Sequence, residues 1–96
     1  MSRRHETMDR ILRHELNLCR ALTMAEIKSL PDCQTRRRGR FEVARWIEKT
    51  GQGGFKIVVQ VLLPCNLGVS TCDAGGILRD NAGVRDLELR EYAEYR

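Results

Sequence analysis

The sequence has few aromatic residues, few histidines and no long apolar run. Only 5% of its 96 residues are aromatic, and its two histidines are His5 and His14. The longest strongly apolar stretch, residues 57–65, is interrupted by Gln60 and is far shorter than the roughly 20 residues that a membrane-spanning helix needs. The first residues are polar and contain no apolar segment typical of a signal peptide. These absences predict a cytoplasmic protein with no membrane segment.

The four cysteines lack the close spacing that metal sites require. Cys19, Cys33, Cys65 and Cys72 include no C-x-x-C pair, so the sequence gives no support for a zinc site. Disulfides are rare in the reducing cytoplasm, although the spacing of Cys65 and Cys72 would let them bridge two strands. We therefore expect reduced thiols, no metal ion and no other cofactor.

The remaining polar residues form no recognisable catalytic arrangement. His14 and Cys19 are five positions apart on an expected helix, which turns their side chains about 140° away from each other. The segment TGQGG, residues 50–54, has three glycines but lacks the lysine and the following helix of a phosphate-binding loop. Three acidic residues near the C-terminus share one edge of an expected helix, namely Glu88, Glu91 and Glu94. We interpret this edge as a solvent-exposed surface. The sequence therefore identifies no catalytic residue and favours a protein that is not an enzyme.

The N-terminal part has the periodicity of two helices. Residues 7–22 predict an amphipathic helix because apolar side chains recur at three- and four-residue intervals. These apolar positions are Met8, Ile11, Leu12, Leu16, Cys19 and Leu22. Thr23 and Glu26 have the spacing of a capping box, which predicts a short second helix over residues 24–30. Pro31 ends that helix, since the residue before a proline disfavours the helical conformation.

Residues 40–49 and 55–63 predict a β-hairpin, because both alternate and the second is rich in β-branched residues. The register that pairs Lys49 with Phe55 gives one continuous apolar face. The same register sets Ile47 opposite Ile57, Val43 opposite Val61, Arg45 opposite Val59, Trp46 opposite Val58 and Glu48 opposite Lys56. Shifting it by one residue would mix the faces, so this pairing is the prediction.

The other connections and strands carry weaker patterns. Residues 32–39 predict a polar connection, residues 67–73 a short strand, and residues 76–87 a second hairpin whose turn ends at Gly83. Asp86 is the expected N-cap of a last short helix. The whole chain, residues 1–96, is therefore predicted to be a single α+β domain. In it an N-terminal helix and a short second helix pack on an antiparallel β-meander of about four strands, followed by a short C-terminal helix.

The second face of the predicted sheet is unusually apolar. An antiparallel sheet that is covered on one side is expected to be polar on the other, yet this side carries Ala44, Trp46, Val58 and Leu62. One interpretation is that the C-terminal helix covers this face, with Leu89, Tyr92 and Tyr95 packing on Trp46. The other is that the face contacts a protein partner, most simply a second copy of the chain.

The segment TRRRGR, residues 35–40, places four arginines in six positions, Arg36, Arg37, Arg38 and Arg40. Residues 1–40 hold ten basic and five acidic side chains, which gives a net charge of +5, whereas the rest of the chain holds seven basic and eight acidic, which gives −1. The arginines would suit nucleic-acid phosphates. Against this, acids are interspersed, no aromatic residue precedes Phe41 and no DNA-binding motif is readable. A solvated loop that pairs with the acidic C-terminal helix is the competing interpretation.

Together these patterns favour a small binding module of bacterial type that acts as a homodimer or binds a protein partner. The expected contact face is Ala44, Trp46, Val58 and Leu62. A nucleic-acid-binding accessory protein that uses the basic loop, residues 36–40, is the alternative. A third interpretation is a small-ligand-binding domain or an enzyme with a site between the sheet and a helix.

Overall fold

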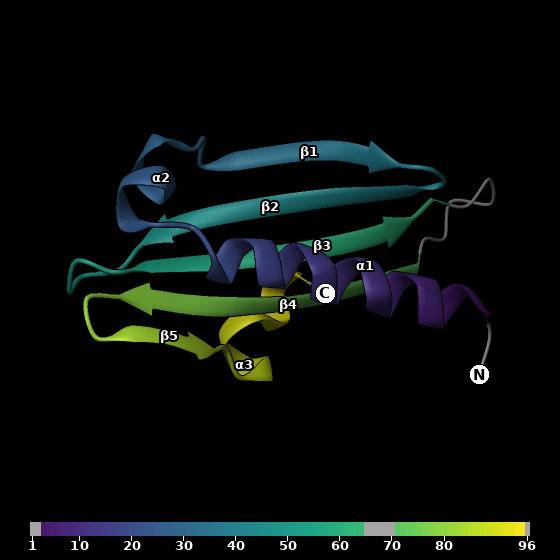
Figure 1. Cartoon of the computed structure of the whole chain (residues 1–96). Helices are drawn as coiled ribbons and strands as arrows, with labels where there is room; N and C mark the ends of the chain where they lie inside the picture. Colours follow the sequence, from purple (N-terminus) through teal and green to yellow (C-terminus); the bar gives the residue numbers. More distant parts are fainter. Residues whose placement is uncertain (1–2, 65–70, 96) are drawn as a thin grey trace.

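The computed structural model describes residues 3–64 and 71–95, with side chains from Glu6 onwards. A long helix covers one face of a five-stranded antiparallel sheet, and the C-terminal segment lies on the opposite face (Figure 1). The predicted α+β class is thus confirmed, with five strands where about four were expected. The elements are α1 (Arg3–Arg20), α2 (Met24–Ser29), β1 (Cys33–Arg38), β2 (Phe41–Lys49), β3 (Phe55–Leu63), β4 (Thr71–Asp80), β5 (Gly83–Asp86), α3 (Leu89–Tyr92) and the 3-10 turn η1 (Ala93–Tyr95).

Helix α1 packs its apolar stripe on β3 and β4 (Figure 1). The five predicted core positions within it are all buried, namely Met8, Ile11, Leu12, Leu16 and Cys19. Gly75 of β4 lies directly beneath the helix, and a Cβ atom there would come within 3.1 Å of Leu16 Cδ1. The missing side chain of Gly75 therefore makes room for Leu16 of the helix. Thr23 and Glu26 form the predicted capping box at the start of α2.

The five strands follow one another in a meander, in the order β1-β2-β3-β4-β5. The predicted β2–β3 register is confirmed, since Lys49 pairs with Phe55 and Ile47 with Ile57. The predicted polar connection is wrong, because most of it forms β1, an edge strand that pairs with β2 from Cys33 to Arg38. Gly39 and Arg40 form the two-residue turn that follows, and Gly39 has the positive φ of 60° that glycine tolerates in such turns.

The second hairpin is also longer than the sequence indicated. β4 is one continuous strand of ten residues and pairs with β3 over nearly its whole length. Part of the predicted strand at residues 67–73 lies outside the described residues. Asp80 caps the β4–β5 turn by accepting hydrogen bonds from the amides of Ala82 and Gly83. Asp86 belongs to β5, and Glu88 is the N-cap of α3, so the N-cap prediction was two residues early.

Candidate functional site

The arginines of TRRRGR do not share one surface. Successive side chains of a strand point to opposite faces, so Arg36 and Arg38 lie on the α1 side of the sheet and Arg37 on the other side. Arg40 lies in the turn after β1. The predicted nucleic-acid contact is therefore divided between the two faces of an edge strand, and only part of it faces α1.

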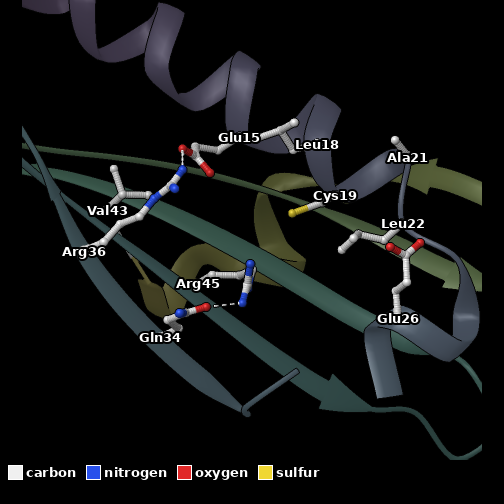
Figure 2. Close-up of a pocket in the computed structure, with 10 residues that line it drawn as sticks. All are labelled: Glu15, Leu18, Cys19, Ala21, Leu22, Glu26, Gln34, Arg36, Val43 and Arg45. Atoms are coloured by element: carbon white, nitrogen blue, oxygen red, sulfur yellow. Dashed lines mark hydrogen bonds and ion pairs between the residues drawn. The ribbon is translucent and has the colours of Figure 1, made fainter. Parts of the chain in front are cut away.

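Glu15 of α1 holds the two arginines that face the helix. Its carboxylate is only 10% exposed and accepts hydrogen bonds from Arg36 and from Arg38 Nη1, the latter at 3.2 Å. Figure 2 shows the Glu15 carboxylate reaching from the helix toward the guanidinium of Arg36. These ion pairs join α1 to the edge strand across the part of the sheet that α1 does not cover.

A first groove of about 450 Å³ lies on the α2 side of these ion pairs (Figure 2). Arg45 and Val43 of β2 line it, and Arg45 Nη2 donates to Gln34 Oε1 at 2.5 Å. Arg45 Nε is buried and has no hydrogen-bond partner among the described residues. Cys19 also lines the groove, and burial raises the pKa of its thiol. The thiol therefore stays protonated at neutral pH, which disfavours a nucleophilic role.

A second groove of about 620 Å³ lies on the other side of the Glu15 ion pairs, beside the β1–β2 turn. Arg10 and His14 of α1 line one wall, and Arg38 and Arg40 line the other. Within the described part of the chain, Arg10 and Arg40 have no hydrogen bond or ion pair with a protein group. This groove therefore concentrates positive charge that the chain itself leaves unneutralised.

The outer edge of β1 has unpaired backbone groups. The amide of Ile47 donates to the carbonyl of Asp32 at 2.8 Å. Because hydrogen-bonded and non-hydrogen-bonded pairs alternate along an antiparallel ladder, positions 34, 36 and 38 also bond toward β2. The amides and carbonyls of Cys33, Thr35 and Arg37 then point outward, away from the sheet. All of β1 except Arg38 is exposed, so this edge is open to another strand.

The C-terminal segment lies on the predicted contact face. Ala44 is 3% and Val58 1% exposed, while Trp46 and Leu62 are half-buried. The ring of Tyr95 lies 5.1 Å from that of Trp46. The Tyr95 carbonyl accepts from Gln60 Nε2, and its hydroxyl donates to Glu48. Of the residues expected to pack on Trp46, Tyr95 does so, whereas Leu89 is 52% exposed. A partner on this face would therefore meet Trp46, Leu62 and Tyr95, whereas Ala44 and Val58 are already buried within the chain.

The described part of the chain contains no cluster of metal-ligating side chains. No group of three or more histidine, cysteine, aspartate or glutamate side chains there could hold a metal ion. Cys19, Cys33 and Cys72 are free thiols, while Cys65 and the side chain of His5 lie outside the described residues. No helix among residues 3–64 and 71–95 is long and apolar enough to cross a membrane.

The comparisons with known proteins found no match for this chain. No protein-family model matches the chain, and no significant match occurs among the curated proteins or the solved structures. The functional proposal therefore depends on the physical features of the β1 edge and of the grooves beside it.

Proposed function

We propose that the protein is a non-enzymatic binding module that acts as a homodimer joined through β1. The observation that carries this proposal is the open edge, where Cys33, Thr35 and Arg37 direct their backbone groups away from β2. A second copy is the simplest partner for such an edge, because a two-fold axis pairs the same strand with itself. Two sheets joined in this way form one sheet of ten strands, which is within the range of open sheets.

One antiparallel register of β1 with itself is self-complementary. With Thr35 on the two-fold axis, Cys33 lies opposite Arg37 of the second copy, and all three outward-facing residues of each copy can form hydrogen bonds. The same register sets Gln34 opposite Arg36, and it sets Asp32 opposite Arg38. Opposite charges at facing positions stabilise a strand pair. No arginine then faces an arginine directly.

The neighbouring registers are less favourable. Moving the axis to Arg36 sets Arg36 opposite itself, and like charges at facing positions destabilise a strand pair. Moving the axis to Gln34 sets Pro31 opposite Arg37, and proline has no amide hydrogen to donate. Sequence and pairing pattern thus favour the Thr35 axis over both alternatives.

The strand contact is small, so a weak dimer is expected. Stable interfaces bury about 1,600 Å² in total, more than one pair of six-residue strands supplies. Arginines also discourage edge pairing in many proteins by keeping strand edges solvated. We therefore expect association at micromolar concentrations, favoured by the facing Asp32 and Arg38 and weakened by salt.

Crosslinking tests the register. In a Cys33→Ser background, Thr35→Cys places two identical thiols opposite each other on the axis, with Cβ atoms about 5 Å apart. A short bismaleimide is expected to join them efficiently at micromolar protein. Gln52→Cys in the same background is the matched control, because Gln52 is exposed in the β2–β3 turn and lies beyond the paired residues of β1 and β2. Equal, low crosslinking of the two variants would contradict the proposal.

A further inference from the structure

We propose that the dimer binds duplex DNA through its phosphates, using one basic cluster from each copy. The cluster is defined by Arg10, His14, Arg38 and Arg40, the side chains around the second groove. The inference rests on the proposed dimer, since the two-fold axis is what places two clusters on one surface. Both clusters lie on the α1 side of the joined sheet.

The charge balance of the cluster favours an anionic partner. Arg10 and Arg40 make no ion pair within the described chain, and Arg38 shares the single Glu15 carboxylate with Arg36. Two acids of α1 lie within about one helical turn of Arg10: Asp9 is bonded by Arg13, and Glu6 makes no ion pair with Arg10. Glu6 and Asp9 line a hollow with Asp73 of β4, and Arg10 and His14 border this hollow as well as the second groove. The cluster thus keeps two unpaired cations per copy, or four per dimer.

The spacing of the two clusters suits a duplex. The β1–β2 turn begins at Gly39, four residues from Thr35, or about 13 Å along the strand, so two turns related by the axis lie about 26 Å apart. The arginine side chains reach several ångströms beyond the turns, which brings the charged ends to roughly 30–35 Å. One helical turn of B-form DNA is about 34 Å. Phosphates on the same side of a duplex therefore recur at close to this interval.

The surroundings of the cluster disfavour single strands and base readout. Single-strand binding relies on exposed aromatic rings for base stacking, but Phe41 beside the cluster is only 7% exposed. Trp46 and Tyr95 lie on the opposite face of the sheet. Helix α1 packs its apolar stripe along β3 and β4. The predicted contact is therefore electrostatic and independent of sequence.

Fluorescence anisotropy with labelled random-sequence duplexes tests this proposal. Four phosphate contacts predict a slope of log K against log salt near −3.6, which is roughly a 150-fold loss of affinity between about 50 and 200 mM salt. A duplex of about 16 base pairs spans both clusters, whereas one of about 8 base pairs spans less than a turn. The shorter duplex is expected to bind at least tenfold more weakly. Equal affinities for the two duplex lengths would contradict the proposed spacing of the two clusters.

Substitutions test whether binding depends on the cluster itself or only on the net charge of the protein. The double variant Arg10→Gln/Arg40→Gln removes all four unpaired cations of the dimer, and most of the affinity and of the salt slope is expected to disappear. Each single variant should lower the slope by about 1.8. Arg37→Gln is the matched control, because Arg37 is unpaired in the described chain but lies on the opposite face. Equal losses from Arg37→Gln and Arg40→Gln would contradict the assignment.

Light scattering on the same samples distinguishes the failure of this inference from the failure of the dimer. A dimer that binds no duplex at low salt overturns the DNA site and leaves the proposed function intact. A monomer at every concentration overturns the proposed function, and with it the paired clusters. Tighter binding of single-stranded DNA or of an RNA duplex than of the DNA duplex would contradict the choice of partner.

Discussion

Glu15 is the buried carboxylate on which the arrangement of the arginines depends. It lies beside the apolar stripe of α1 and bonds Arg36 and Arg38 of β1. A buried charge is stable only when it is paired and hydrogen-bonded. Its two partners are half-exposed, so the ion pairs orient the edge strand more than they stabilise the core.

Glu15→Gln is expected to lower the free energy of unfolding by about 1–2 kcal/mol. The amide keeps the shape of the side chain but loses the charge that both guanidinium groups contact. Urea denaturation followed by circular dichroism measures the change. Glu6→Gln is the matched control, because Glu6 is exposed and has no partner in the described chain. If both variants unfold at the same urea concentration, the account of Glu15 is wrong.

In the sequence, Glu15 is one of several acids interspersed among the basic residues of the first helix. The signal that could have identified it is its position next to Leu12, Leu16 and Cys19 on the helix surface, since a single acid at the border of an apolar stripe needs a cation opposite. Arg45 gave a similar signal, as a charged residue between Val43 and Ile47 on the inner face of β2. The partners of both residues depend on how α1 lies across the sheet, and helix periodicity does not fix that placement.

Among the elements, those with a strong hydrophobic period were predictable and those at the sheet edges were not. β2 and β3 alternate and face a core, so Ile47 and Ile57 set their register. β1 is exposed along nearly its whole length, so no apolar side chains mark it in the sequence. β4 was divided in the prediction because Gly75 and Gly76 interrupt its pattern. A Cβ atom at Gly75 would crowd Leu16, and one at Gly76 would collide with Leu87 and with the carbonyl of Ile57.

The C-terminal segment is attached by contacts that centre on Tyr95. Burial and the hydrogen bond to Glu48 raise the pKa of Tyr95 to about 12. The unfolded chain would lose this proton near pH 10. Between pH 10 and about 12 the folded chain therefore holds a proton that the unfolded chain has released, so stability contributed by Tyr95 falls as pH rises through this window.

A titration checks this prediction. In the Tyr92→Phe chain Tyr95 is the single tyrosine, and its tyrosinate absorbance is expected to rise near pH 12 when the chain is folded and near pH 10 in urea. Glu48→Gln in the same background removes the carboxylate partner and should lower the folded midpoint. A folded midpoint near pH 10 with Glu48 in place would show that Tyr95 is not held against the sheet.

At the scale of the whole molecule, the sequence indicated both a self-association surface and a basic contact, but at different places. The predicted dimer face is occupied in part by Tyr95, which lies against Trp46. The edge of β1 became visible only once residues 33–38 were placed in the sheet. In the proposed dimer the basic clusters of both copies lie on the same surface, so the dimer interpretation and the nucleic-acid interpretation no longer compete.

The measurement that tests the central claim most directly is the molar mass by light scattering across a protein concentration series. We expect the mass to rise from 11.1 kDa toward twice that value as concentration passes through the micromolar range. Thr35→Pro removes an outward-facing amide that β2 does not use and should keep the chain monomeric, whereas Thr35→Val should behave like the unmodified chain. A constant mass of 11.1 kDa up to millimolar concentration, or equal association of the two variants, would contradict a dimer joined through β1.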